Sequence, residues 1–199
     1  MDTAGEQYAA RMAARLAAMA AEGRNQHGEA TFCAALLEPG ARVLDAGCGT
    51  GRVAIRLAEL GFDCVGVDRD ESMLAVARRT PGIEWVQGDL RTWTSVGGFD
   101  LVVAAGNVVP LVADPPAVVA RLAQHARPDG LLVTGFGLTE RHLPPGAPQL
   151  SLADYDDWCA AAGLQLQARY GSWDAAEFDG GYAVSVLRAA APDSPRPAR

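Results

Sequence analysis

Three glycines at alternate positions follow a short apolar segment that contains an acid. The segment Val43–Gly51 reads VLDAGCGTG, and an amphipathic stretch begins directly after it. This order predicts a strand, a tight turn and a helix start, an arrangement that lets backbone approach a nucleotide-like ligand closely. A dinucleotide-binding turn has the spacing G-x-G-x-x-G and faces a pyrophosphate. Here the spacing is G-x-G-x-G, and Asp45 would repel a pyrophosphate but suits a ligand with an ammonium or sulfonium group.

Further polar residues stand where other predicted strands end. Phe62–Val67 is a predicted strand followed by Asp68, whose carboxylate is placed to accept hydrogen bonds from both hydroxyls of a ribose. Asp89 lies just beyond a third strand, in the segment WVQGDL, and Phe99–Ala105 is a strongly apolar strand that ends near Asn107. Ligands of parallel sheets lie at the carboxyl ends of the strands, so we expect these residues to converge on one site.

With these motifs the chain resembles the class I S-adenosylmethionine (SAM) dependent methyltransferases, whose first motif is (V/L)-(L/V)-D-x-G-x-G-x-G. The resemblance covers about Leu36 to Arg188. It implies SAM as the cofactor and S-adenosylhomocysteine as the product, but it names no acceptor. It also implies that Asp45 and the backbone of Gly47 hold the methionine end, that Asp68 holds the ribose, and that Asp89 and Leu90 hold the adenine. The other expected cofactor-binding residues are Gly49, Gly51, Arg69, Met73 and Asn107.

The expected function is methyl transfer from SAM to an oxygen or nitrogen nucleophile of a small molecule. Such a reaction depends chiefly on alignment, and a base is needed only if the nucleophile must lose a proton. His142, on the predicted loop Gly137–Leu150, is the candidate base, with a plain surface residue as the alternative interpretation. Trp173, Asp174 and Phe178 are expected to line either a pocket or a dimer interface.

Two other functions are compatible with a glycine-rich turn. One is a SAM-binding module without catalysis, which the same three acids would serve. The other is a nicotinamide-dependent oxidoreductase, which would require the longer glycine spacing and a catalytic Tyr/Lys or His pair. All 17 basic residues are arginine, so a Tyr/Lys pair is impossible.

Alternation of strand and helix patterns predicts an α/β fold with a doubly wound, mostly parallel sheet and helices on both faces. As in the methyltransferase sheet, we expect seven strands with the last one antiparallel. The predicted strands are Arg42–Ala46, Phe62–Val67, Ile83–Gln87, Phe99–Ala105, Leu131–Phe136, Leu164–Trp173 and Tyr182–Arg188, with a turn at Pro128-Asp129-Gly130. The predicted helices are Thr3–Ala21, Glu29–Leu37, Gly51–Leu60, Glu71–Arg79, Pro115–His125 and one from Ser151 to Ala162.

Length and composition favour one domain, residues 1–189, in which residues 1–28 form a helical lid and residues 190–199 a disordered tail. The net charge is −7 and no basic stripe occurs, which disfavours nucleic acid and membrane surfaces as partners. The four cysteines form no C-x-x-C pair, so we expect reduced thiols and no metal site. We expect a cytoplasmic protein, without a signal peptide, that is a monomer or a homodimer.

Overall fold

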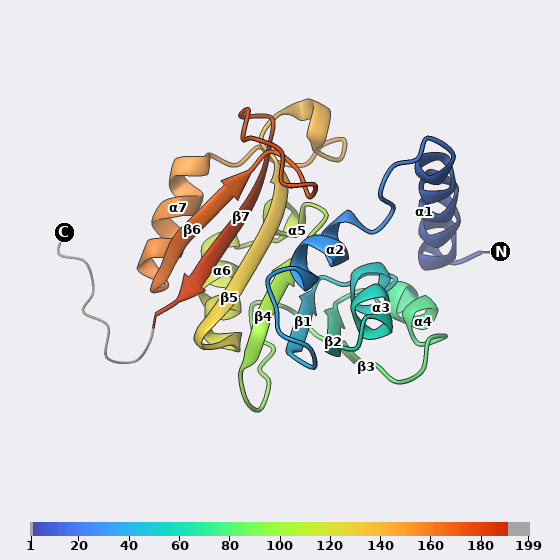
Figure 1. The fold of residues 1–199 in the computed structure, drawn as a ribbon, viewed down its shortest axis with the longest axis horizontal. Coiled ribbons are helices and arrows are strands. Elements are labelled where there is room, and N and C mark those ends of the chain that lie inside the picture. The colour runs from blue at the N-terminus through green and yellow to red at the C-terminus, as the bar shows by residue number, and fades with distance from the viewer. Residues whose placement is uncertain (1, 191–199) are drawn as a thin grey trace.

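The chain forms a seven-stranded sheet in the order β3-β2-β1-β4-β5-β7-β6, as seen in a computed structural model that describes residues 2–190. β1 to β5 are parallel, and β7 runs antiparallel to both of its neighbours (Figure 1). The predicted α/β fold is therefore confirmed. All of the predicted tail except Ala190 lies outside the described residues.

The elements follow one another in the predicted order. The strands are β1 (Arg42–Ala46), β2 (Asp63–Asp68), β3 (Glu84–Gln87), β4 (Phe99–Ala104), β5 (Ala126–Gly137), β6 (Leu164–Tyr170) and β7 (Tyr182–Ala189). The helices are α1 (Ala4–Ala21), α2 (Gly28–Ala34), α3 (Arg52–Glu59), α4 (Glu71–Ala77), α5 (Val108–Leu111), α6 (Pro115–His125) and α7 (Leu152–Ala161), with a short 3-10 helix at Glu140–His142.

Helices cover both faces of the sheet because successive strand residues point to opposite sides. Val43 of β1 packs in a cluster with residues of α2 and α3, whereas Leu44 packs in a second cluster with residues of α6 and α7. Figure 1 shows α2 and α3 in front of the strands and α6 behind them. Both residues are completely buried, as the near-continuous apolar pattern of the strand predicts.

The structure corrects local predictions. The turn expected at Pro128-Asp129-Gly130 is instead a bulge inside β5, where Asp129 has a φ of 61° and the pairing with β4 shifts between Phe99 and Leu101. A bulge uses the same turn-forming residues without ending the strand. Second, α2 ends at Ala34 rather than Leu37. The end of β4 is irregular as predicted, with positive φ at Gly106 and Asn107, and the short helix α5 that follows it was not predicted.

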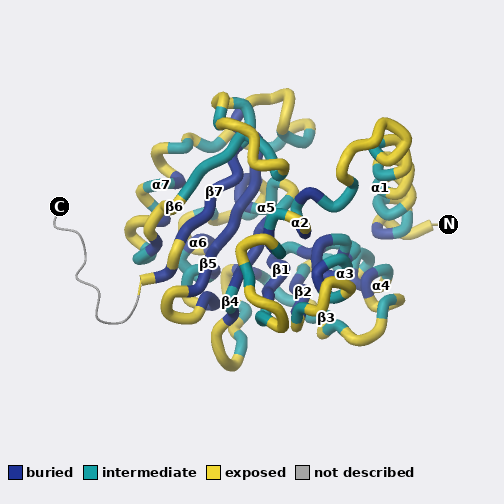
Figure 2. The backbone as a smooth tube through the Cα atoms, viewed as in Figure 1, coloured by how far each residue is buried: buried dark blue, intermediate teal, exposed yellow. Residues whose placement is uncertain are grey.

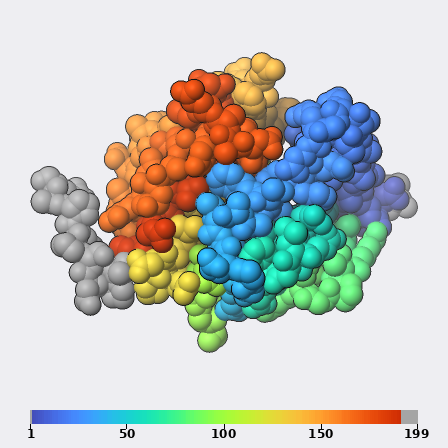
Figure 3. Space-filling view, in the orientation of Figure 1, coloured from blue at the N-terminus to red at the C-terminus, as the bar shows by residue number. Residues whose placement is uncertain are grey.

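The N-terminal helix α1 stands apart from the sheet and packs against α4. Its first turn is closed by a capping box in which Thr3 and Glu6 bond to each other's backbone N–H groups. Figure 2 shows most of α1 as exposed or intermediate, and Figure 3 shows this blue segment beside the teal and green atoms of α3 and α4. Gly5 is the one residue of α1 that is buried.

Among the described residues, no helix combines the length and hydropathy that crossing a membrane requires.

Candidate functional site

A cavity of about 1030 Å³ opens at the carboxyl ends of the central strands. Its walls come from α1, the turn after β1, the ends of β2, β3 and β4, and the segments after β5 and β6. The predicted site residues that line it are Asp45, Gly47, Gly49, Asp68, Arg69, Met73, Asp89, Leu90, Asn107 and His142. Gly51 does not line the cavity.

The three glycines of the turn have different tasks, although each has a positive φ. A Cβ at Gly47 would lie 2.6 Å from Val108, and one at Gly51 would lie 2.4 Å from the ring of Trp85. Both positions therefore need glycine for packing as well as for conformation. A Cβ at Gly49 would meet no described atom within 4 Å. Open space above Gly49 is thus continuous with the cavity that this residue lines.

Asp45 is a buried carboxylate beside this turn, with 3% of its surface exposed. Its Oδ2 accepts a hydrogen bond of 3.1 Å from the backbone N–H of Ala54 in α3. Burial raises the pKa of Asp45 to about 7, although the Ala54 hydrogen bond and the charge of Arg52 act in the opposite direction. A carboxylate in this state is stabilised by any cation that binds next to it.

Asp68 fastens the glycine turn to the end of β2. Its Oδ2 accepts a 2.7 Å hydrogen bond from the N–H of Gly49, and its Oδ1 accepts a 2.9 Å hydrogen bond from the N–H of Asp70. A carboxylate has about four acceptor positions, so these two bonds leave about two for a ligand. Asp68 can therefore hold the turn and bind hydroxyl groups at the same time.

Hydrogen bonds continue from Asp68 to the N-terminal helix. Asp70 caps α4 by accepting bonds from the N–H and the hydroxyl of Ser72, at 2.8 and 2.7 Å. The Ser72 hydroxyl oxygen in turn accepts a 3.1 Å bond from the N–H of Gly5 in α1. Hydrogen bonds thus link Gly5 of α1 through Ser72 and Asp70 to the carboxylate at the end of β2.

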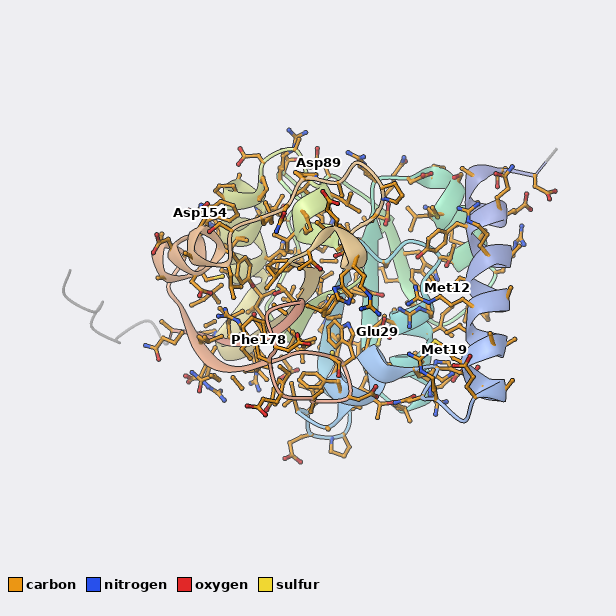
Figure 4. All side chains as sticks on the ribbon, turned by 90° about the horizontal axis from the view of Figure 1, so that it is seen from above. Met12, Met19, Glu29, Asp89, Asp154 and Phe178 are labelled. Atoms are coloured by element: carbon orange, nitrogen blue, oxygen red, sulfur yellow. The ribbon has the colours of Figure 1, made fainter. Side chains whose placement is uncertain are left out.

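Asp89 lies at the edge of the cavity in an exposed ion pair with Arg91 (Figure 4). Hydrogen bonds from the Arg91 guanidinium and backbone lower the pKa of Asp89 to about 2. Each carboxylate oxygen accepts from Arg91, at distances of 2.5 to 3.1 Å. Asp89 is therefore ionised at neutral pH, and the neighbouring Leu90 is buried.

Asn107 and His142 connect the end of β4 to the segment after β5. Asn107 has a φ of 68°, its side-chain amide donates to the carbonyl of His142 at 3.2 Å, and its oxygen accepts from the N–H of Gly137 at 2.7 Å. The His142 ring is exposed, and its Nδ1 lies 3.0 Å from the hydroxyl of Thr139. Asn107 therefore positions the loop, a task that its place in the sequence does not reveal.

Sequence reasoning missed an ion pair at the cavity. Arg52, the residue after the glycine turn, donates to both oxygens of Glu29 in α2 at 2.8 and 2.5 Å. Burial raises the pKa of Glu29, but the hydrogen bonds and charge of Arg52 outweigh this and hold the pKa below its usual value. In Figure 4, Met12 and Met19 of α1 point toward the side of the molecule on which Glu29 lies. The sequence carried no local signal of this ion pair, because its two residues are 23 positions apart.

Two aromatic residues complete the wall opposite α1. Trp173 and Asp174 line the cavity, whereas Phe178 packs against the core. The indole N–H of Trp173 donates to the hydroxyl of Tyr182 at 3.3 Å. Burial raises the pKa of Tyr182 to about 12, so its phenol stays protonated at neutral pH. Trp173 was expected at a pocket or a dimer interface, and the structure places it at the pocket.

Comparisons with known proteins agree with this architecture. Residues 43–130 match a family described as "Methyltransferase domain". The chain is 37% identical to trans-aconitate 2-methyltransferase of Azoarcus sp. over 48% of this chain and 39% of that protein, so it spans less than half of that relative. It is 31% identical to the ubiquinone biosynthesis O-methyltransferase of Xanthomonas axonopodis pv. citri over 68% of each chain.

A solved structure is similar over nearly its whole length. The TehB-like SAM-dependent methyltransferase from Corynebacterium glutamicum has a TM-score of 0.78 and 32% identity, with 92% of this chain and 98% of that chain covered. The chain therefore belongs to the class I SAM-dependent methyltransferases, and its cofactor is SAM. This membership favours methyl transfer over the nicotinamide chemistry that a glycine-rich turn also allows.

Proposed function

We propose that this methyltransferase acts on an oxygen or nitrogen nucleophile of a small molecule that binds in the cavity beside SAM. The observation that carries the proposal is the extent of the cavity, about 1030 Å³. Ligand pockets usually measure roughly 300–1,000 Å³, so this space is large enough for a cofactor and a second small molecule. Its lining extends beyond the expected cofactor residues to α1, Leu143 and Trp173.

The buried acid supports a role for Asp45 at the methionine end of SAM. An ammonium group next to this carboxylate would stabilise its ionised form, which burial disfavours. The backbone at Gly47 and the open space at Gly49 would leave room for the ligand. The positions of these three residues thus fit a cofactor that carries positive charge.

The ribose and adenine ends would lie toward β2 and β3. Asp68 keeps acceptor positions for two hydroxyl groups. Asp89 accepts four hydrogen-bond contacts from Arg91, so an adenine amino group would replace one of these contacts when it binds there. Leu90 would face the adenine with its backbone amide. Arg69 and Met73, which line the same part of the cavity, would flank the ring.

Bound SAM supplies a methyl group that its positively charged sulfur has already activated. The protein's residues therefore have to align the acceptor and exclude water, effects worth up to about 7–11 kcal/mol in favourable model systems. A proton acceptor is required only for a nucleophile that must be deprotonated. His142 is the proposed base for such an acceptor, because its exposed ring lies at the cavity.

We further infer that residues 1–28 act as a lid on a single domain of residues 1–189. α1 contributes Tyr8, Met12 and Met19 to the cavity wall, yet it is anchored to the domain at its first turn by Gly5. A helix attached in this way can close the cavity after the ligands have entered.

The test is release of S-adenosylhomocysteine from SAM in the presence of small phenols, carboxylic acids and amines. Acceptor-dependent release would support the proposal, with the methylated atom then identified by mass spectrometry. A protein that binds S-adenosylhomocysteine but releases none with any acceptor would instead be a SAM-binding module. Asp45→Asn is the matched negative control, because it removes one charge with little change in size.

A further inference from the structure

The apolar face of α1 is turned toward the cavity instead of toward the protein core. Tyr8, Met12, Leu16 and Met19 recur along one side of the helix, are half-buried and line the cavity. The alanines on the other side, including Ala13, are exposed. An amphipathic helix normally buries its apolar stripe against other elements of the fold. Here α4 is the element against which α1 packs, and this contact lies near the first turn of α1.

The contact between the two helices fixes how α1 stands over the cavity. A Cβ at Gly5 would lie 1.9 Å from the backbone oxygen of Ser72, so the helices meet at the closest approach that glycine permits. An ion pair between Glu6 and Arg79, with a distance of 2.7 Å, adds to this contact. The helix is thus held at one end, and Met12, Leu16 and Met19 extend beyond its attachment.

The opposite wall is also apolar. Leu111 and Val112 follow β4, Leu143 and Pro144 follow β5, and all four line the cavity with Trp173. Trp173 is held by its hydrogen bond to Tyr182 and by edge contact with Phe32, with ring centroids 5.7 Å apart. A molecule between these walls would contact apolar side chains on both sides.

Charged groups on this side of the cavity face solvent or each other. Glu29 and Arg52 form their own ion pair, with both side chains about one-fifth exposed. The remaining charged lining residues on these segments, Arg15, Arg24, Arg141 and Asp174, are exposed. The Met12, Leu16 and Met19 side chains therefore offer apolar area between α1 and Trp173, while Asn25, Gln26, Ser172 and the phenol of Tyr182 add polar groups to the same part of the lining.

We propose that the methyl acceptor is a small molecule with an apolar body, and that the Met12–Leu16–Met19 face of α1 is the wall that binds this body. The inference rests on the proposed function, since it assigns the part of the cavity next to the cofactor residues. Methionine side chains are flexible and polarizable, so this wall adapts to apolar bodies of different shape. The hydroxyl or amino nucleophile of the acceptor would then face the methyl group of bound SAM.

The test uses para-alkylphenols, from para-methylphenol to para-pentylphenol, titrated calorimetrically into the protein with and without saturating S-adenosylhomocysteine. Each added methylene should tighten binding about threefold to fourfold if it is buried against the wall. Met12→Gln and Met19→Gln should flatten this dependence on chain length. Ala13→Gln and Ala17→Gln place the same side chain on the exposed face of the same helix and should leave the dependence unchanged.

The outcomes separate the two proposals. Failure of S-adenosylhomocysteine to bind the folded protein would count against the proposed function. The titrations without S-adenosylhomocysteine would still measure whether the apolar face of α1 binds the phenols. Three results would overturn the inference about α1. The phenols do not bind, their affinity does not change with the length of the alkyl chain, or the dependence on chain length persists in both methionine variants. Circular dichroism of each variant verifies that the helix is retained.

Discussion

The affinity for S-adenosylhomocysteine should fall about tenfold when the pH is lowered from 8 to 6, because of Asp45. Burial raises the pKa of this carboxyl to about 7 in the free protein. It is then about nine-tenths ionised at pH 8 and about one-tenth ionised at pH 6. The ammonium group of the ligand binds the ionised form. Binding therefore releases a proton at low pH, and affinity rises with pH until it levels off above about pH 8.

Calorimetric titration at several pH values measures this effect, and Asp45→Asn tests its source. The asparagine variant should bind more weakly at pH 8 and should lose the dependence on pH. Asp154→Asn is the matched control, since Asp154 lies in α7 on the opposite side of the domain from α1 (Figure 4). Equal affinity of the original protein at both pH values would show that ionisation of Asp45 does not control binding. A dependence on pH that persists in Asp45→Asn would assign the effect to another group.

Three further substitutions, with Ser72→Ala as a comparison for one of them, test the ribose site, the glycine turn and the attachment of α1. Asp68→Ala should weaken S-adenosylhomocysteine binding by about 1.5–3 kcal/mol, roughly tenfold to 150-fold, and unchanged affinity by calorimetry would rule out the ribose assignment. Gly49→Ala should fold, with a loss of stability of about 1 kcal/mol because alanine is strained in the left-handed backbone conformation. It should also bind the ligand more weakly, because the added methyl group enters the open space. Thermal denaturation measures the loss of stability, and titration measures the loss of binding. Gly5→Ala should loosen α1 and speed tryptic cleavage at Arg24, although alanine normally favours a helix by about 1 kcal/mol. Ser72→Ala, which removes the hydrogen bond without a clash, should have a smaller effect, and equal cleavage rates for all three proteins would contradict the proposed attachment of α1.

The sequence was most informative where function and local structure coincide. Asp45 and Asp68 could be assigned to the site because each is adjacent to a turn at a strand end, and the strands are strongly apolar. Tyr182 could not be assigned, and Trp173 could be assigned only to a pocket or a dimer interface, because both residues reach the cavity through the pairing of β6 and β7, which depends on contacts distant in sequence. The bulge at Asp129 was mistaken for a turn since both use residues that tolerate positive φ.

Relations between helices were equally hidden. The pattern of α1 predicted an amphipathic helix, but not that its apolar face would border a cavity. That arrangement follows from the contact between Gly5 and Ser72, two residues that are ordinary in sequence and meet only in the folded chain. The ion pair of Glu29 and Arg52 likewise joins α2 to α3 and has no local signature.

We propose that the cavity at the carboxyl ends of the strands binds the cofactor through Asp45, Asp68 and the glycine turn. The most direct test is a crystal structure of the protein with S-adenosylhomocysteine, obtained after calorimetry has established binding. We predict one ligand per chain, with its amino group at Asp45 and its ribose hydroxyls on Asp68. Two results would contradict this assignment of the site: a folded protein that binds neither SAM nor S-adenosylhomocysteine, and a ligand that is bound away from these two carboxylates.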